Sequence, residues 1–99
     1  MKILIVEDDD GVRDFLRTNL TADLHVVDTT TNGTDGSFLA RTNPYDIIIL
    51  DYSLPEKNGI QVCQEVRAAG IETPILFAAV LIFRLRYGAA TRAPVPFVS

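Results

Sequence analysis

The middle of the chain reads Asp46-Ile47-Ile48-Ile49-Leu50-Asp51, an aliphatic run enclosed by two carboxylates. A short, continuous run rich in isoleucine is typical of a strand that is buried on both faces of a parallel sheet. A second run of this kind, Lys2 to Val6, opens the chain and is followed at once by Glu7 and Asp8. We therefore expect two buried strands, each of which ends in carboxylates.

Helical and strand patterns alternate outward from these two runs. A helix is predicted for residues 10–20, a short strand for Leu24–Val27, a weak helix for Gly36–Arg41, a helix for 60–69 and a strand for 73–77. Such alternation predicts an α/β fold, a doubly wound parallel sheet with right-handed crossovers and helices on both faces. We expect the flavodoxin-like strand order 2-1-3-4-5, in which the first and third strands are neighbours.

Glu7, Asp8 and Asp51 follow the first and third predicted strands, whose carboxyl ends meet at one edge of the sheet. Three carboxylates in one place repel one another unless a cation neutralises them, and Mg²⁺ prefers oxygen ligands of this kind. An aspartate beside such an ion can act as a nucleophile toward phosphorus. The alternative interpretation, helix caps or solvated loop residues, is favoured for Asp9 and Asp10.

The acidic residues and their surroundings resemble the receiver domain of bacterial response regulators over residues 1–77. The segments that carry the resemblance are Ile3-Leu4-Ile5-Val6-Glu7-Asp8-Asp9, Asp46 to Pro55, Gly59, and Thr73-Pro74-Ile75-Leu76. The spacing between the acidic pair, the later aspartate, the proline and the glycine makes the resemblance specific, whereas each piece alone is weak evidence.

The resemblance implies a role for each matching residue. Asp51 would accept a phosphoryl group from the histidine of a sensor kinase, and Glu7 and Asp8 would bind Mg²⁺ together with Asp51. The backbone carbonyl of Ser53 would complete the metal shell. Pro55 and Gly59 would shape the loop around the site.

The chain departs from the family pattern in two places. The family has a serine or threonine at the end of the fourth strand, where this sequence has Ala78 or Ala79. The family also has a lysine at the end of a fifth strand, but the lysines here are Lys2 and Lys57, which lie elsewhere. Because the loss of one oriented donor typically costs about 2.7–4 kcal/mol of transition-state stabilisation, we expect phosphoryl signalling to be impaired.

Composition sets the limits of the molecule. With 99 residues, 47% of them hydrophobic and 22% charged, the chain fits one small globular domain. The longest apolar run, Ile75 to Phe83, is too short for a membrane span, and carboxylates directly after the first strand argue against a secretory signal. We expect a cytoplasmic protein. All acidic residues precede residue 73, and an acidic body disfavours binding to nucleic acid.

The last part of the chain has a different composition. Residues 73–99 contain Arg84, Arg86 and Arg92 and no acid. We therefore divide the chain into a receiver-like domain, residues 1–77, and a divergent tail of the same domain, residues 78–99, so that the fold is incomplete or altered after the fourth strand. A frameshift or internal deletion after Phe77 and a natural divergent end both explain the tail. Ala79–Leu85 is a candidate replacement strand, and we expect residues 78–99 to promote a homodimer.

The expected function is a phosphoryl-accepting switch of a two-component system, whose partner is a sensor histidine kinase and whose cofactor is Mg²⁺. This interpretation makes the chain a signalling module, not an enzyme, with no nucleic-acid or membrane partner. The alternative is a receiver-like interaction or self-association module that is not phosphorylated. A small Mg²⁺-dependent phosphohydrolase ranks last, because no general base is recognisable beyond Asp9 and Asp10.

Overall fold

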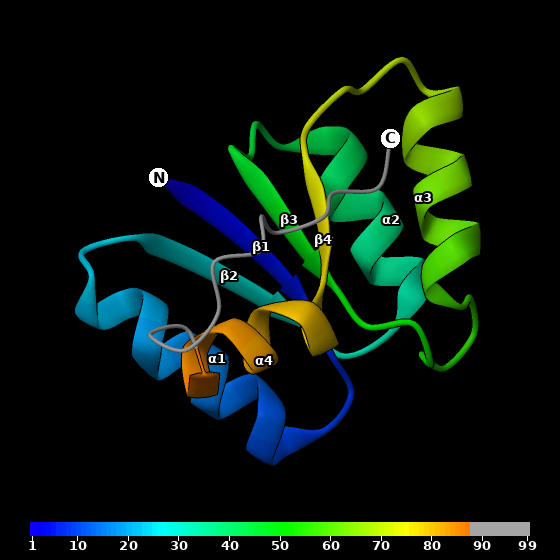
Figure 1. Ribbon diagram of the computed structural model, residues 1–99. Coiled ribbons are helices and arrows are strands. Elements are labelled where there is room, and N and C mark those ends of the chain that lie inside the picture. Colours follow the sequence, from blue (N-terminus) through cyan, green and yellow to red (C-terminus); the bar gives the residue numbers. More distant parts are fainter. Residues whose placement is uncertain (88–99) are drawn as a thin grey trace.

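A central parallel sheet with helices on both faces forms the fold (Figure 1). The computed structural model describes residues 1–87, and their side chains as far as Ile82. In chain order the elements are β1 (Lys2–Val6), α1 (Asp10–Ala22), β2 (Val26–Thr30), α2 (Gly33–Thr42), β3 (Ile47–Leu50), α3 (Gly59–Ala68), β4 (Ile75–Phe77) and α4 (Ala78–Tyr87).

The described strands are parallel and have the order β2-β1-β3-β4, which confirms the predicted order of the first four. Val6 of β1 pairs with Leu50 of β3, and Leu50 pairs with Phe77 of β4. The carboxyl ends of these three strands therefore lie side by side at one edge of the sheet, where open α/β sheets bind their ligands.

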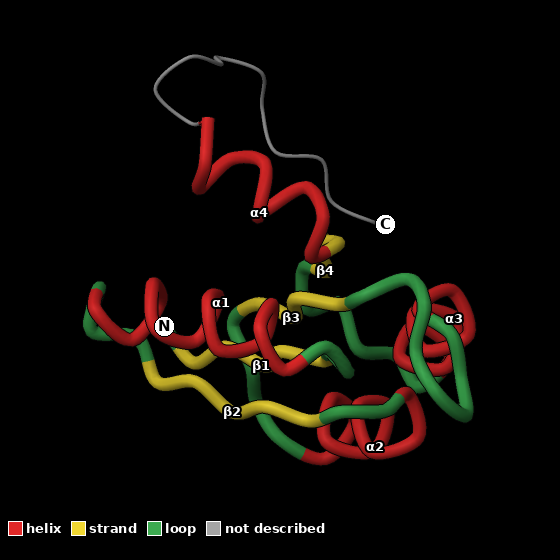
Figure 2. Tube along the Cα trace, turned by 90° about the horizontal axis from the view of Figure 1, so that it is seen from below, coloured by secondary structure: helices red, strands yellow, loops and turns green. Residues whose placement is uncertain are grey.

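Each face of the sheet packs against its own pair of helices (Figure 2). On the face toward α2 and α3, alternate residues of the strands pack against residues of these helices and Tyr45. This cluster consists of Leu4, Val6, Ala40, Tyr45, Ile48, Leu50, Val62, Cys63, Val66 and Ile75. The face toward α1 and α4 buries Ile3, Ile5, Leu16, Ile49 and Ala78. Because β1 and β3 contribute to both clusters, their side chains are continuously apolar from Ile3 to Val6 and from Ile47 to Leu50, as the sequence indicated.

Short polar side chains begin the first three helices. Asp9 accepts a hydrogen bond from the backbone N–H of Val12 and caps α1, which confirms the interpretation of this residue as a helix cap. Asn32 caps α2 in the same way. Asn58 and Gln61 form a reciprocal capping box at the start of α3, an arrangement that satisfies two backbone donors left open by the helix geometry.

The predicted position of the second strand is wrong at its start. Leu24 lies outside β2, with a positive φ of 65° and a side chain that is 91% exposed, and it belongs to the turn after α1. The strand extends instead to Thr29 and Thr30, which look like a polar turn in the sequence. Because β2 is an edge strand, its residues are not buried on both faces and its pattern is not continuously apolar.

The candidate replacement strand at Ala79–Leu85 is also wrong, because these residues lie in α4. Ala78, Leu81 and Ile82 recur at helical spacing and contact the cluster on the α1 face. Alanine and leucine are strong helix formers, and the run lacks the alternation of a half-buried strand. The rest of the tail, residues 88–99, lies outside the described residues.

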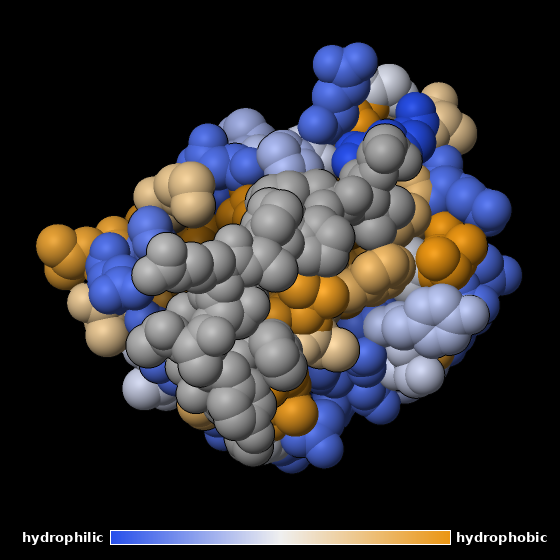
Figure 3. All heavy atoms as spheres, in the orientation of Figure 1, coloured by the Kyte–Doolittle hydropathy of each residue, from blue (hydrophilic) through white to orange (hydrophobic). Residues whose placement is uncertain are grey.

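On the face of the molecule seen in Figure 3, hydrophobic side chains are visible near the centre, and hydrophilic and hydrophobic side chains are interspersed at the rim. Among the helices of residues 1–87, none has the length and apolar character to cross a lipid bilayer.

Candidate metal centre

The register of β1 and β3 brings the predicted acidic residues to the same point. Val6 and Leu50 are paired, and the backbone N–H of Asp51 donates to the carbonyl of Val6 at 2.9 Å. Glu7 and Asp8 directly follow β1, and Asp51 directly follows β3. Three residues from two distant parts of the sequence therefore lie at the same end of the sheet.

The three carboxylates form a tight cluster. One carboxylate oxygen from each of Glu7, Asp8 and Asp51 lies within 4.8 Å of the others. Glu7 is buried, with an exposed fraction of 4%, whereas Asp51 is half-buried and Asp8 is exposed. The cluster is therefore open to solvent on one side and closed by the protein on the other.

The electrostatics of the cluster disfavour three negative charges. The pKa of the Glu7 carboxyl is raised to about 7, chiefly by burial and also by the neighbouring Asp51 and Asp8, against the backbone N–H of Asp9, which lowers it. That N–H donates to Glu7 Oε2 at 3.2 Å. The local geometry thus holds a carboxyl group where its charged form is poorly stabilised by the protein alone.

This donor set fits a hard divalent cation. Mg²⁺ takes oxygen ligands in an octahedron and is commonly bound by one to a few carboxylates together with water or phosphate oxygens. A partly open cluster of three carboxylates supplies the protein ligands and leaves positions for further oxygens. A bound cation would also offset the repulsion that raises the pKa of Glu7.

The loop between β3 and α3 folds closely over Asp51. The backbone N–H of Gly59 donates to the carbonyl of Tyr52 at 2.8 Å. A Cβ atom on residue 59 would lie 2.5 Å from the Asp51 carbonyl oxygen, so that only glycine fits at this approach. Ser53, whose carbonyl is predicted to complete the metal shell, and Pro55 are exposed within this loop. Ser53 stays a predicted ligand.

Sequence reasoning missed Arg13. Its guanidinium donates to the backbone carbonyl of Glu7 at 3.0 Å and pairs with Asp10, so that it holds the turn between β1 and α1. The spacing of Asp10 and Arg13, three residues apart on a helix, is a signal for their ion pair. Nothing in the sequence indicates the contact with Glu7, which depends on how the chain enters α1.

The end of β4 lacks the hydroxyl of the family pattern. Phe77 is the last residue of β4, and Ala78 and Ala79 open α4, with Ala78 buried and Ala79 exposed. Both lysines have partners outside the cluster of Glu7, Asp8 and Asp51. Lys57 pairs with Glu65, and Lys2 lies over the ring of Tyr45.

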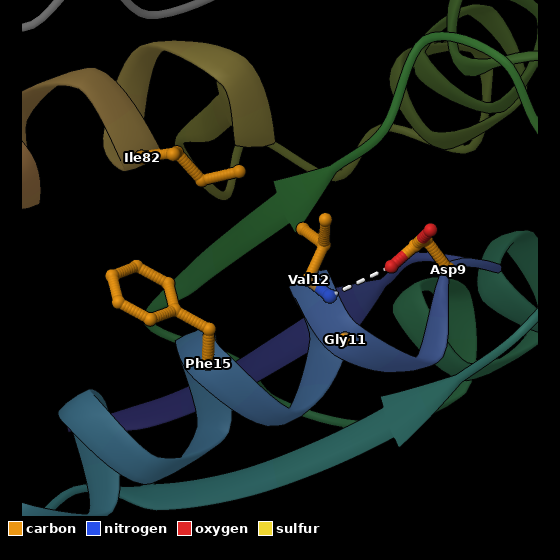
Figure 4. A pocket seen from close by; sticks show the side chains of 5 residues that line it. All are labelled: Asp9, Gly11, Val12, Phe15 and Ile82. Carbon is orange, nitrogen blue, oxygen red and sulfur yellow. Dashed lines mark hydrogen bonds between the residues drawn. The ribbon is translucent and has the colours of Figure 1, made fainter.

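A separate cleft of about 400 Å³ lies between α1 and α4, lined by Asp9, Gly11, Val12, Phe15 and Ile82. Figure 4 shows Val12 and Phe15 of α1 below Ile82 of α4, with Asp9 turned back to its cap contact at Val12. Asp9 therefore serves α1, and the carboxylate cluster found among residues 1–87 consists of Glu7, Asp8 and Asp51.

Comparison with known proteins agrees with the fold. The model of the response regulator receiver domain matches residues 3–81. The chain belongs to this family. As a receiver domain it is part of the two-component signalling systems, and its doubly wound sheet is the flavodoxin-like fold of its relatives.

Curated relatives of this receiver domain include transcriptional regulators. The probable transcriptional regulatory protein SilR of Salmonella typhimurium is 44% identical over 81 residues, which cover 82% of this chain and 36% of SilR. The transcriptional regulatory protein CusR of Escherichia coli is 43% identical over the same length and the same shares. The receiver domain thus spans about a third of the length of these two relatives.

Solved receiver domains have the same fold. The receiver domain of a sensor histidine kinase from Pseudomonas aeruginosa, described with a magnesium ion coordinated in its active site cleft, has a TM-score of 0.73 and 28% identity, over 77% of this chain and 64% of that one. The non-phosphorylated HemR receiver domain of Leptospira biflexa has a TM-score of 0.70 and 30% identity, over 98% and 83% of the two chains.

Proposed function

We propose that this receiver domain accepts a phosphoryl group on Asp51, with Mg²⁺ held by Glu7, Asp8, Asp51 and the backbone carbonyl of Ser53. The observation that supports the proposal is the cluster of three carboxylates within 4.8 Å, at the sheet edge where this fold binds ligands. The donor of the phosphoryl group would be the phosphohistidine of a sensor kinase, the general partner of receiver domains.

The chemistry assigns a separate part to each residue. A carboxylate oxygen of Asp51 attacks phosphorus, the bond from phosphorus to the donor breaks, and the electron pair leaves with the donor's nitrogen or oxygen. The metal ion, when bound, offsets charge on the transferring group. Glu7 and Asp8 hold that ion, and Gly59 lets the loop after Asp51 approach closely enough to shape the site.

We propose further that the response to phosphorylation is weak. Ala78 and Ala79 have no hydroxyl to donate to a phosphoryl oxygen, and Lys57 is paired with Glu65. Phosphoryl transfer to Asp51 would therefore take place without the donors that stabilise its transition state. The same missing donors would also leave the aspartyl phosphate without a contact that couples it to a conformational change. On this proposal, Mg²⁺ binding is retained while phosphorylation is slow.

Phosphorylation by a small donor tests the proposal directly. The full chain is incubated with acetyl phosphate and Mg²⁺, and its mass is measured with time. We expect a gain of one phosphoryl group that is absent from Asp51→Asn and absent when a chelator removes Mg²⁺. A mass gain that persists in Asp51→Asn would place the acceptor elsewhere and refute the assignment.

The second candidate function is a receiver-like interaction module that keeps the acidic cluster but is not phosphorylated. The absence of a hydroxyl at the end of β4 favours it over an ordinary receiver switch. In this case residues 78–99 would mediate a homodimer. Light scattering over a range of concentrations decides the matter: a monomer at every concentration removes the homodimer, and dimers without any mass gain support this second candidate.

A further inference from the structure

A polar network, the Lys57 bridge, links the β3–α3 loop to both helices on its side of the sheet. Lys57 Nζ donates to Glu65 Oε2 of α3 at 2.6 Å. The other carboxylate oxygen, Glu65 Oε1, accepts from the hydroxyl of Ser37 of α2 at 2.6 Å. Ser37 in turn accepts from Arg41 Nε at 3.1 Å. We call Lys57, Glu65, Ser37 and Arg41 together the Lys57 bridge.

The bridge is more than an exposed ion pair. Exposed pairs typically contribute little to stability, and the side chains of Lys57 and Glu65 are each about one third exposed. Ser37, however, is completely buried, and its hydroxyl is satisfied within the bridge. The hydrogen bonds from Lys57 and Ser37 also lower the pKa of Glu65, so that its charged form is the one held in place.

The same end of the loop is anchored to α2 through its backbone. The N–H of Gly33 donates to the carbonyl of Pro55 at 3.1 Å, and the N–H of Lys57 donates to that carbonyl at 2.8 Å. A Cβ atom on residue 33 would lie 1.9 Å from the Lys57 carbonyl oxygen. Between these anchors Glu56 adopts a positive φ of 70°, an uncommon conformation for a residue other than glycine, asparagine or aspartate.

In the sequence, Ser53 lies between Tyr52 and Pro55, whose backbone carbonyl groups both accept hydrogen bonds. On one side the Tyr52 carbonyl accepts from Gly59, and on the other the Pro55 carbonyl accepts from Gly33 and Lys57. The position of the Ser53 carbonyl therefore depends on both ends of the loop. The bridge holds one of these ends through a side chain that does not itself reach the carboxylate cluster.

We propose that Lys57 is a positioning residue for the metal centre. Through its ion pair with Glu65 it fixes the β3–α3 loop, and through the loop it places the Ser53 carbonyl for the cation. This inference rests on the proposed Mg²⁺ site. It adds that the affinity of the site is set partly by a network that joins α2 and α3 behind the loop.

Calorimetric titration of the full chain with Mg²⁺ tests the inference. Lys57→Met keeps the aliphatic stem but removes the ammonium group, and we expect its Mg²⁺ dissociation constant to rise about tenfold, the lower end of effects for groups that orient metal ligands. Glu65→Gln should have the same effect, and the double variant should be no weaker than either single variant, since both break one interaction. Lys57→Arg should restore most of the affinity.

The matched control is Arg17→Met, which breaks an ion pair with Asp14 of 2.9 Å on the surface of α1. This variant should bind Mg²⁺ like the wild type. If Lys57→Met lowers the free energy of unfolding but leaves the Mg²⁺ affinity unchanged, the bridge is merely structural and the inference is wrong.

A second readout separates this inference from the proposed function. If the wild type does not bind Mg²⁺, the proposed metal site fails, and amide hydrogen exchange of Gly33 and Gly59 then decides whether the bridge fixes the loop. Exchange at Gly33, whose N–H bonds to Pro55, should become faster in Lys57→Met and stay unchanged in Arg17→Met. Unchanged exchange in Lys57→Met would overturn the positioning role.

Discussion

Glu7 is the residue whose surroundings conflict most with its charge. It is buried, and that burial together with the neighbouring Asp51 and Asp8 raises its pKa to about 7. A residue held in this way stabilises a bound cation at the expense of the metal-free fold. This conflict between local stability and binding is expected at functional sites.

Glu7→Gln should therefore stabilise the metal-free protein and weaken Mg²⁺ binding. The amide keeps an oxygen that can accept from the N–H of Asp9, while the buried charge and its repulsion disappear. We expect the free energy of unfolding in a chelating buffer to rise by about 1 kcal/mol. Urea denaturation measures this change.

Glu72→Gln, at an exposed acid outside the cluster, is the control for the loss of one negative charge. It should leave both the free energy of unfolding and Mg²⁺ binding within error of the wild type. A Glu7→Gln variant that is less stable than the wild type in chelator would show that the carboxyl contributes contacts that outweigh its burial and repulsion.

The candidate site could be predicted from sequence because its acids follow strands whose order is predictable. Glu7, Asp8 and Asp51 each stand at the end of an apolar run, and parallel neighbours place such ends together. The contact of Arg13 with Glu7 and the contacts of Ser37 were not predictable, because each depends on how separate parts of the chain come together. Their residue types are common on solvated helix surfaces, where no pattern marks them.

At the scale of elements, buried strands and well-capped helices were the predictable parts. β1 from Ile3 onward and all of β3 are apolar, and α1 starts at a clear Asp9 cap. The predicted position of β2 was shifted toward the N-terminus, because an edge strand tolerates polar residues such as Thr29 and Thr30, which do not look like a strand in the sequence. The continuous apolar run of α4 hides the helical spacing of Ala78, Leu81 and Ile82, which becomes evident only from their packing on the α1 face.

The contact between Tyr45 and Asp28 ties the segment before β3 to the edge strand β2. The buried Tyr45 hydroxyl donates to Asp28 Oδ2 at 2.7 Å, and burial together with that contact raises the pKa of Tyr45. Tyr45→Phe should lower the free energy of unfolding by about 1.5–3 kcal/mol, since it removes one hydrogen bond to a charged group. Denaturant titration at neutral pH measures the loss.

The partner substitution Asp28→Asn provides the check on Tyr45→Phe. The double variant should be little worse than the single ones, because both changes act on one hydrogen bond. Fully additive losses would instead mean that Tyr45 and Asp28 stabilise the protein through different contacts.

The Lys57 bridge gives the packing of α2 and α3 a dependence on pH. Hydrogen bonds from Lys57 and Ser37 lower the folded-state pKa of Glu65 below its ordinary 4.5. The stability that this shift contributes is fully present above pH 4.5 and is lost as the pH falls through the lower, folded pKa. The difference in stability between the wild type and Glu65→Gln should therefore shrink as the solution is acidified from neutral pH.

Thermal or urea unfolding of both proteins over this acid range measures the effect. The control is Asp14→Asn, which breaks the exposed pair with Arg17. The difference in stability between the wild type and this variant should change much less over the same pH range. A constant difference between wild type and Glu65→Gln down to the acid limit would mean that the carboxylate is not stabilised by its partners.

At the scale of the whole molecule, the sheet separates two helical faces, and the carboxylate cluster lies at the carboxyl ends of the central strands. β1 and β3 are the shared walls of the two cores, and Glu7 and Asp51 directly follow them. A cation that joins these two strand ends would therefore act on the centre of the fold and not on a peripheral loop. Binding and global stability should be coupled.

Mg²⁺ should consequently raise the free energy of unfolding of the full chain, by about 2.7 kcal/mol when its concentration is a hundred times the dissociation constant. The physical reason is that the unfolded chain does not hold the three carboxylates together. The midpoint of thermal unfolding should rise with the logarithm of the Mg²⁺ concentration, while NaCl at the same ionic strength should have a small effect.

Asp51→Asn should lose most of the response, because one ligand charge is gone, whereas Glu72→Gln should keep it. Equal stabilisation of Asp51→Asn and wild type by Mg²⁺ would mean that the ion binds elsewhere on the acidic surface.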